Sequence, residues 1–453
     1  MISKVLKQTG GAECQADALR EKILSAENEI KTAGRIFYVS EKGDDSNDGL
    51  TPETAFKTVS KVDSLKLEQN DTVLFERGSV FRLSDKLWLC PCTNYGAYGE
   101  GEKPKFYGSL RDYADPLIWS VTDNPNVWCL KLEAKESKNR AALTTFNNDT
   151  YIGEWKFRRE ELLKDGDFYH DIENGIYYLY FEGGNPGEYF DNIEISTVIV
   201  ALRASFIKKV HIDNICFKYF TFGAMLLGEC DDITVTNCEL GWLGGAIFSM
   251  RGEKPLRYGN GMEFWHDCRD ITVRDCWVYQ VFDAAMTFQG SGETIARFDN
   301  IHFDNNLIEY CSMNIEYWVG SGGGADESHI KDITYKGDII RMSGYGWGGI
   351  YRWDTEDQAL LLGWNRLYED LTNFVISDCI LDCADSYMIY MYGPELQEGI
   401  TLENISYYQK ATSGRHNQTE IIRGYDNKAT CQEDLEAAIA LFDKNPKLVK
   451  WLD

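Results

Sequence analysis

The feature that most constrains the fold is a repeat between residues 210 and 379. Six segments, spaced 23 to 41 residues apart, alternate apolar and polar positions and then carry Asn, Asp or Gly. They are VHIDNI (210–215), ITVTNC (233–238), ITVRDC (271–276), IHFDNN (301–306), ITYKGD (333–338) and FVISDC (374–379). Because one short strand per repeat cannot bury its own inner face, we expect the repeats to stack about 4.8 Å apart as a parallel β-solenoid.

A second strand recurs in each repeat: GAMLLG (223–228), GMEFWH (261–266), AAMTFQ (284–289), NIEYWV (314–319), GGIYRW (348–353) and YMIYMY (387–392). Since successive side chains point to opposite faces, an inward column is predicted for Met225, Met262, Met286, Ile315, Ile350 and Ile389. The next residues form an outward column of Leu226, Glu263, Thr287, Glu316, Tyr351 and Tyr390. A second outward column contains Gly228, Trp265, Gln289, Trp318, Trp353 and Tyr392.

This outward face mixes aromatic residues with carboxylates, which is unusual for plain solvent surface. A contiguous row of exposed aromatics indicates a binding site, and flat rings suit the faces of sugars. The alternative is that loops cover the face and make the aromatics a secondary core. Insertions at 242–260, 319–330 and 354–370 flank the same strands, and loops on a rigid scaffold often build sites.

The rest of the chain divides by composition and pattern. We expect an N-terminal capping helix segment (1–35, helix at 16–31), first solenoid coils (36–110) and an inserted small β-rich module (111–190). The main solenoid follows (191–425), then a C-terminal capping helix (426–453), because solenoid ends need covering. Thirteen scattered cysteines show no paired metal-ligand spacing, so buried free thiols are expected, with no metal and no cofactor.

The charge balance bears on partners. The chain carries 46 Lys and Arg against 72 Asp and Glu, a net charge of −26, which disfavours nucleic acid and polyanionic sugars. No run of 18 apolar residues predicts a membrane span, and no apolar signal-peptide region is visible, so a cytoplasmic location is expected. The sequence is compatible with a homo-oligomer and does not decide the oligomeric state.

Several segments resemble a known superfamily. FYVSEKGDDSNDGLTPETAFKTVSKV (37–62), NDTVLFERGSVFR (70–82) and GAYGEGEKPKFYGS (96–109) resemble the first coils of right-handed parallel β-helix (pectate-lyase-like) carbohydrate-active enzymes, especially their glycoside hydrolase branches. DGDFYHDIENGIYYLYFEGGNP (165–186) is similar to a small β module inserted in several of these hydrolases, and YGNGMEFW (258–265) with VFDAAMTFQG (281–290) to their active-site coils. The resemblance implies an all-β, right-handed parallel β-helix, but that fold hosts hydrolases, lyases and epimerases alike.

Glycosidic hydrolysis needs two carboxyl groups, one as acid and one as nucleophile or base. Glu263 and Asp283 are predicted as the pair, with Glu316 as a third acid that tunes a pKa or binds a hydroxyl. In a fully extended strand Asp283 would lie about 13 Å along the face from Glu263. A turn at 282–284 would shorten this separation, and the resemblance implies that Asp283 faces the cleft. Each acid also has a plainer interpretation. Glu263 could be an ordinary surface carboxylate, Asp283 a turn cap and Glu316 a salt-bridge partner of Arg352.

The expected sugar contacts come from the same face and its flanks. Trp265, Trp318 and Trp353 are predicted stacking platforms, and His266, Gln289 and Arg352 hydroxyl-binding groups. His266 could equally be a satisfied turn histidine, and Arg352 falls at an inward position, which is odd for Arg. The remaining candidates are Tyr351, Asp354, Arg257 and Tyr258.

Three functions remain open at this stage. The first is a glycoside hydrolase acting on neutral oligosaccharides. The second is a polysaccharide lyase or epimerase on uronic acids, which needs a base and a cation and is kept open by Arg251, Arg257, His266 and Arg352. The third is a non-catalytic glycan-binding solenoid.

Overall fold

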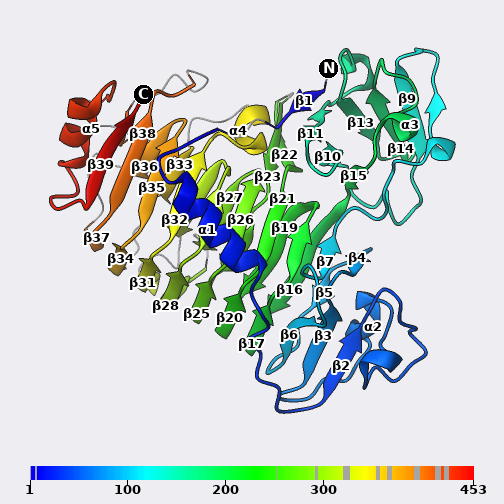
Figure 1. Cartoon of the computed structure of the whole chain (residues 1–453), viewed down its shortest axis with the longest axis horizontal. Coiled ribbons are helices and arrows are strands. Elements are labelled where there is room, and N and C mark those ends of the chain that lie inside the picture. Colours follow the sequence, from blue (N-terminus) through cyan, green and yellow to red (C-terminus); the bar gives the residue numbers. More distant parts are fainter. Residues whose placement is uncertain are drawn as a thin grey trace.

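The structure is a computed structural model that describes residues 2–5, 8–252, 254–290, 294–319, 327–352, 358–364, 370–391, 398–413, 420–422 and 428–453. Of residues 318, 362–364, 370 and 391 it describes the backbone only. Within these ranges the chain forms three long parallel sheets that share one hydrophobic core (Figure 1). This is the parallel β-helix that the repeat predicts.

The three sheets are named by what they carry. The site sheet has eight strands: β5 (Leu87–Trp88), β16 (Val198–Ser205), β19 (Phe220–Gly228), β24 (Met262–Trp265), β27 (Ala284–Gly290), β30 (Met313–Val319), β33 (Ala359–Trp364) and β36 (Tyr387–Met391). The repeat sheet has ten: β2 (Ile36–Val39), β3 (Thr72–Glu76), β6 (Asn94–Tyr98), β17 (Lys208–Asp213), β20 (Asp231–Thr236), β25 (Cys268–Arg274), β28 (Arg297–Asp304), β31 (His329–Lys336), β34 (Asp370–Ser377) and β37 (Ile400–Glu403). The flank sheet has ten: β4 (Val80–Arg82), β7 (Lys105–Tyr107), β18 (Cys216–Lys218), β21 (Glu239–Leu243), β26 (Trp277–Val281), β29 (Leu307–Glu309), β32 (Ile339–Ser343), β35 (Ile380–Ala384), β38 (Ser406–Lys410) and β39 (Leu448–Leu452).

The predicted register of the six repeat segments is confirmed. Val210 pairs with Ile233, and the ladder continues through the first residue of every later segment to Phe374. The Asn, Asp or Gly at the end of each segment has a positive φ, from 51° at Asp275 to 71° at Gly337. These residue types tolerate the left-handed conformation, so each repeat turns at the same point and enters the flank sheet.

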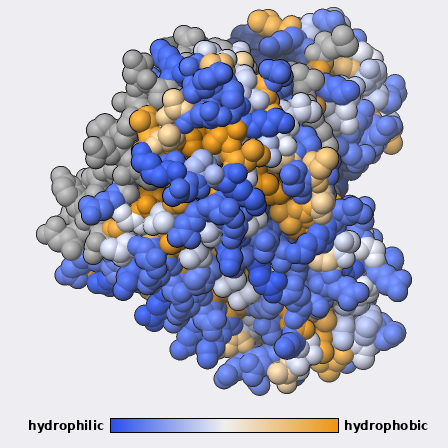
Figure 2. Space-filling view, turned by 60° about the vertical axis from the view of Figure 1, so that its left-hand side comes forward, coloured by the Kyte–Doolittle hydropathy of each residue, from blue (hydrophilic) through white to orange (hydrophobic). Residues whose placement is uncertain are grey.

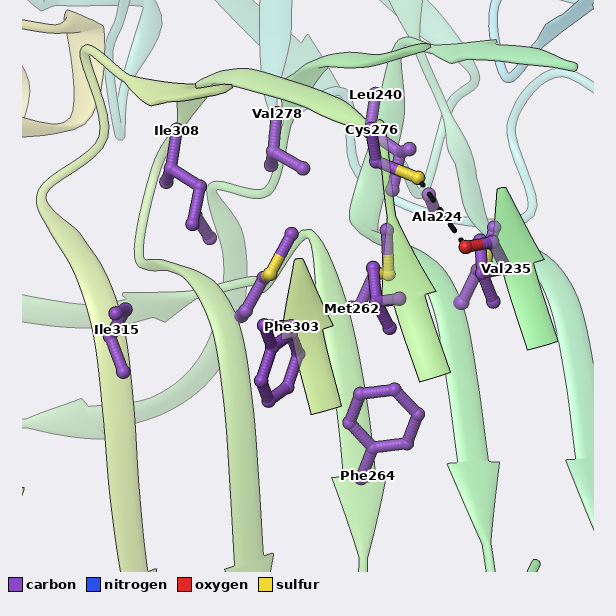
Figure 3. Close-up of a cluster of buried hydrophobic side chains, with 14 of the residues drawn as sticks. Ala224, Val235, Leu240, Met262, Phe264, Cys276, Val278, Phe303, Ile308 and Ile315 are labelled. Atoms are coloured by element: carbon purple, nitrogen blue, oxygen red, sulfur yellow. Dashed lines mark hydrogen bonds between the residues drawn. The ribbon is translucent and has the colours of Figure 1, made fainter. Parts of the chain in front are cut away.

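The core is built from the inward columns of the stacked strands. Met225, Met262, Met286 and Ile315 lie side by side on consecutive strands, as predicted. Figure 3 shows this interior, where Met262, Phe264, Phe303 and Ile315 point into one space and the Cys276 thiol contacts the carbonyl of Val235. The buried cysteines are therefore packing residues, and each described cysteine is a free thiol.

One coil departs from the prediction. Residues 347–351 form the helix α4 (Trp347–Tyr351), and the next strand of the site sheet is β33. Leu361 takes the inward position predicted for Ile350, which is 46% exposed. The Gly-rich stretch before Ile350 favours a strand only weakly. The segment ALLLGW (359–364) instead has the run of apolar residues that a strand of the site sheet requires.

The inserted segment has a core of its own. Its five-stranded sheet contains β8 (Ser120–Val121), β9 (Val127–Lys131), β12 (Glu154–Trp155), β13 (Asp167–Asp171) and β14 (Ile176–Tyr180). A second sheet contains β1 (Ser3–Lys4), β10 (Leu143–Phe146), β11 (Tyr151–Ile152) and β15 (Ile193–Ser196). Short helices η2 (Pro116–Ile118), η3 (Arg159–Glu161) and α3 (Pro186–Tyr189) connect these strands. We call this unit the module; its second sheet includes the N-terminal strand β1 and extends past residue 190.

The helices cover the solenoid in two ways. α1 (Glu13–Leu24) is shorter than predicted and lies along the outer face of the flank sheet rather than over an end (Figure 1). Ala16 and Ile23 pack there against Leu307 and Ile339 of the flank sheet, and Arg20 forms an ion pair with Glu309 beside them. η1 (Pro52–Thr54) and α2 (Val59–Asp63) belong to the N-terminal coils, and α2 buries two valines in the main core.

α5 (Gln432–Ile439) lies at the C-terminal end, where Leu435 and Ile439 enter the main core. The predicted C-terminal helix (426–453) is therefore shorter than expected, because Leu448–Leu452 forms β39 and pairs in parallel with β38 as the last strand of the flank sheet. Figure 2 shows a largely hydrophilic surface in which hydrophobic residues gather in a band, as expected for a chain with this charge excess.

Candidate active site

The site sheet places two of the candidate acids, Glu263 and Glu316, in one column, which we call the acid column. Consecutive strands pair Leu226 with Glu263, Glu263 with Thr287, and Thr287 with Glu316. The ladder then continues to Leu362 and Tyr390. Glu263 and Glu316 therefore lie two coils apart, with Cα atoms about 9–10 Å from each other.

Glu263, on β24, is held by an amide just before its own strand. The Asn260 Nδ2 donates to Glu263 Oε2 at 2.7 Å, and the Asn260 Oδ1 accepts from the main-chain N of Ala284 at 3.1 Å. Glu263 is only 6% exposed. Burial, reinforced by the negative charge of Asp283, raises the pKa of Glu263 to about 7, although the hydrogen bond from Asn260 opposes the rise.

Asp283 lies beside Glu263 because the chain bends before β27. Phe282 and Asp283 are bends rather than extended strand, at the place where the sequence predicts a turn. The main-chain N of Asp283 donates to the carbonyl of Gly259 at 3.2 Å. The Arg352 guanidinium forms an ion pair with the Asp283 carboxylate and stacks 5.4 Å from the ring centre of Tyr258.

Arg352 resolves an anomaly of the sequence pattern. Its inward position followed from placing 348–353 on a strand, but the residue directly follows α4. From there it reaches Asp283, so the described ion pair of Arg352 is with Asp283, whereas the alternative reading of the sequence paired it with Glu316.

Glu316, on β30, belongs to a polar cluster one coil from Thr287. Its Oε2 accepts from Thr287 Oγ1 at 3.0 Å and from Gln289 Nε2 at 2.7 Å. Gln289 Nε2 also lies 2.9 Å from Thr287 Oγ1. These donors fix the direction of the Glu316 carboxylate.

Trp265 and His266 lie at the far end of β24. Their rings are tilted, with centroids 5.0 Å apart, and Trp265 is half-buried. His266 has φ of 61°, donates its main-chain N to Gln289 O at 2.8 Å, and places Nδ1 3.6 Å from Glu229. His266 is thus a turn residue whose side chain is 20% exposed.

Other predicted site residues lie elsewhere. Tyr351 is on α4 and packs with the cluster that contains Leu143 and Ile152 of the module, so Leu362 replaces it in the outward column. In the second column, Trp318 pairs with Trp364 of the next strand. Trp353 and Asp354 lie outside the described residues, as does the side chain of Trp318.

Arg257 also departs from its predicted role. It is buried and donates to the carbonyls of Gly245 and Ala142, both at 2.8 Å, so it does not face the acid column. Tyr258, the next residue, lies at the site through its contact with Arg352.

Sequence reasoning missed Asn260 and the orienting role of Thr287. The signal for Asn260 was the Gly-Asn-Gly run at 259–261: Gly259 has φ of 144°, and a Cβ there would lie 2.3 Å from the Cα of Gly244. Only glycine fits so close a backbone contact, and it presents the Asn260 amide to β24.

The acid column is covered rather than open. Glu263, Asp283, Thr287, Gln289 and Glu316 are all buried, whereas the sequence predicts an exposed trough. Two hollows lie elsewhere: one of about 760 Å³ between the N-terminal segment and the flank sheet, and one of about 310 Å³ beside Phe206 and Cys268.

The described part of the chain offers neither a metal-binding cluster nor a helix that could span a membrane. Among its residues, no group of three or more His, Cys, Asp or Glu is arranged to hold a metal ion. Of the helices described there, none has the length and apolar character needed to cross a membrane.

Comparison with known proteins gives likeness of fold. No family model matches the chain, and no curated protein matches it. Similar solved structures include a glycoside hydrolase (10% identity, TM-score 0.45, 87% of this chain and 100% of that one). XylC in complex with xylose (14%, 0.49, 83% and 69%) and pectate lyase Pel9A (12%, 0.40, 85% and 77%) are also similar.

These TM-scores lie below 0.5, so the likenesses carry neither activity nor substrate to this chain. The parallel β-helix is established by the chain's own strand pairing, and the predicted fold is confirmed on that ground.

Proposed function

We propose that the chain is a glycoside hydrolase acting on neutral oligosaccharides, with Glu263 and Asp283 as its two carboxyl groups. The observation that carries the proposal is the contrast between their environments. Glu263 is buried with a pKa of about 7, while the neighbouring Asp283 is paired with the Arg352 guanidinium. Two adjacent carboxyl groups in such different environments are suited to opposite roles.

In this mechanism Glu263 is the general acid. Near neutral pH a large fraction of Glu263 keeps its proton, which can be delivered to the leaving-group oxygen of the glycosidic bond. Asp283, ion-paired with the Arg352 guanidinium, either attacks the anomeric carbon or activates a water. After the bond breaks, Glu263 is ionised, and the second half-reaction or solvent returns its proton.

Asn260 has the supporting role of orienting Glu263. It holds one carboxyl oxygen, Oε2, and leaves the other for the proton that is transferred. Because its own Oδ1 is fixed by the main chain of Ala284, the amide cannot flip without losing that hydrogen bond.

Glu316, Thr287 and Gln289 form the sugar-hydroxyl site in this proposal. Their polar atoms lie within hydrogen-bonding distance of one another, and hydroxyl groups can both donate to the carboxylate and accept from the amide. A neutral substrate fits better than a uronate, because this face carries three carboxyl groups, Glu263, Asp283 and Glu316, and Arg352 is engaged with Asp283.

The test is a screen of chromogenic aryl glycosides and neutral oligosaccharides. NMR of the first-formed anomer on any hit then distinguishes retention from inversion. Release of reducing sugar supports the proposal. Unsaturated products from uronate polymers, detected by their ultraviolet absorbance, would indicate a lyase instead, and binding without turnover would indicate a non-catalytic solenoid.

A further inference from the structure

A two-stranded hairpin rises next to the acid pair. β22 (Ala246–Arg251) and β23 (Lys254–Tyr258) run antiparallel within the insertion between β21 and β24. Ile247 pairs with Arg257, but the next pair is Ser249 with Leu256, so Phe248 is an extra residue in its strand. Such a bulge redirects a side chain, and bulges are frequent beside active sites.

One face of the hairpin leads to the catalytic acids. The Phe248 ring lies 5.6 Å from the ring of Tyr258, and the Arg352 guanidinium lies 5.4 Å from the same tyrosine ring. Arg352 in turn pairs with Asp283. A row of contacts therefore runs from Asp283 outward through Arg352 and Tyr258 to Phe248.

The opposite face anchors the hairpin to the module. The Arg257 guanidinium lies between Trp155 of the module, at 5.0 Å, and Phe282, at 4.6 Å, and donates to the carbonyl of Ala142. Burial without a carboxylate among its described contacts lowers the pKa of Arg257 to about 9. The hydrogen bonds of Arg257 to the carbonyls of Gly245 and Ala142, together with its two ring contacts, fix the hairpin relative to the module and to Phe282.

Phe248 itself is left in solvent. It is 71% exposed, while most of the chain's phenylalanines are buried in its cores. A large aromatic residue that is exposed, supported by the Tyr258 ring and placed at the end of a row starting at the reactive carboxylates has the properties of a stacking platform.

We propose that Phe248 is a specificity-determining residue that stacks on a further sugar ring of the substrate, bound next to the ring at the acid pair. The inference rests on the proposed function and assigns it a substrate of more than one neutral sugar unit. Arg257 is a positioning residue in this arrangement, because it acts only through the hairpin.

The experiment compares the full-length wild type with F248A, F248Y and the control F206A. Phe206 is 80% exposed but lies at the end of β16, outside the row. Each protein is assayed on the oligosaccharide that the screen identifies and on the glycosyl fluoride of the same sugar, whose leaving group carries no ring. F248A should lose about three- to tenfold in kcat/KM on the oligosaccharide, mostly through KM.

On the glycosyl fluoride F248A should stay within about twofold of wild type, F248Y should retain oligosaccharide activity, and F206A should match wild type on both substrates. An equal loss on both substrates, or no loss on the oligosaccharide, would overturn the role of Phe248 while leaving the hydrolase proposal standing. If the wild type hydrolyses nothing, calorimetric titration with the same neutral oligosaccharides decides separately. Weaker binding by F248A than by F206A supports the platform, and equal binding or no binding refutes it.

Discussion

Replacing Glu263 by Gln should stabilise the protein while removing its proposed acid. In the folded chain the pKa of Glu263 is about 7, against 4.5 for an ordinary glutamate. Between these values the folded state binds a proton that the unfolded state has released, so folding becomes less favourable as the pH rises. Each pH unit across that interval costs about 1.4 kcal/mol, which gives about 3 kcal/mol at pH 7 and above.

Glutamine does not titrate, and its carbonyl can still accept from Asn260 Nδ2. The advantage of E263Q should therefore be small near pH 4.5, grow as the pH rises to 7, and then stay constant. Urea unfolding midpoints of both proteins at pH 5 and pH 8 measure the difference. The control is E21Q, the same substitution at an exposed position of α1, which should show no such growth.

An E263Q advantage that is equal at pH 5 and pH 8 would refute the reasoning, because the effect must follow the titration of one carboxyl group. A destabilised E263Q at pH 8 would refute it more strongly. That result would mean that the buried carboxylate is compensated by contacts other than those described.

The remaining predictions use the same physical arguments. D338N should also stabilise the protein between pH 5 and 8, because complete burial raises the pKa of Asp338 to about 8. In urea unfolding, the difference in midpoint between D338N and wild type should shrink toward pH 4. The kcat of the wild type should fall above about pH 7, where Glu263 loses its proton, and a profile that stays flat to pH 9 would contradict Glu263 as the acid. R352M should lower kcat about ten- to a hundredfold through Asp283, with R352K losing less; unchanged kcat in R352M would remove Arg352 from the mechanism.

The stacking of the solenoid could be predicted because it depends on patterns of period two. The repeat segments fix which residues pair, and every predicted pair from Val210 to Phe374 is found. The prediction failed where an insertion interrupts the pattern, at α4 and β33, because a short Gly-rich run and a strand of similar composition cannot be separated by periodicity alone.

The site was predictable only as far as the strands define it. Glu263, Thr287 and Glu316 share a column in the sequence register and also in the structure. The contacts of Arg352 and Asn260 depend on turns and insertions whose paths no local pattern specifies, so their partners became visible only in three dimensions. The burial of Glu263, Thr287 and Glu316 also depends on turns and insertions, so the strand pattern alone did not predict it.

The most direct test of the central claim is the turnover of E263Q and D283N on the substrate that the screen identifies, with circular dichroism confirming that both variants keep the wild-type fold. The account predicts that each substitution lowers kcat by about 10²- to 10⁴-fold, while E21Q, at an exposed position of α1, stays near wild type. Near-wild-type turnover in either E263Q or D283N would contradict the assignment of these two carboxyl groups as the reacting pair.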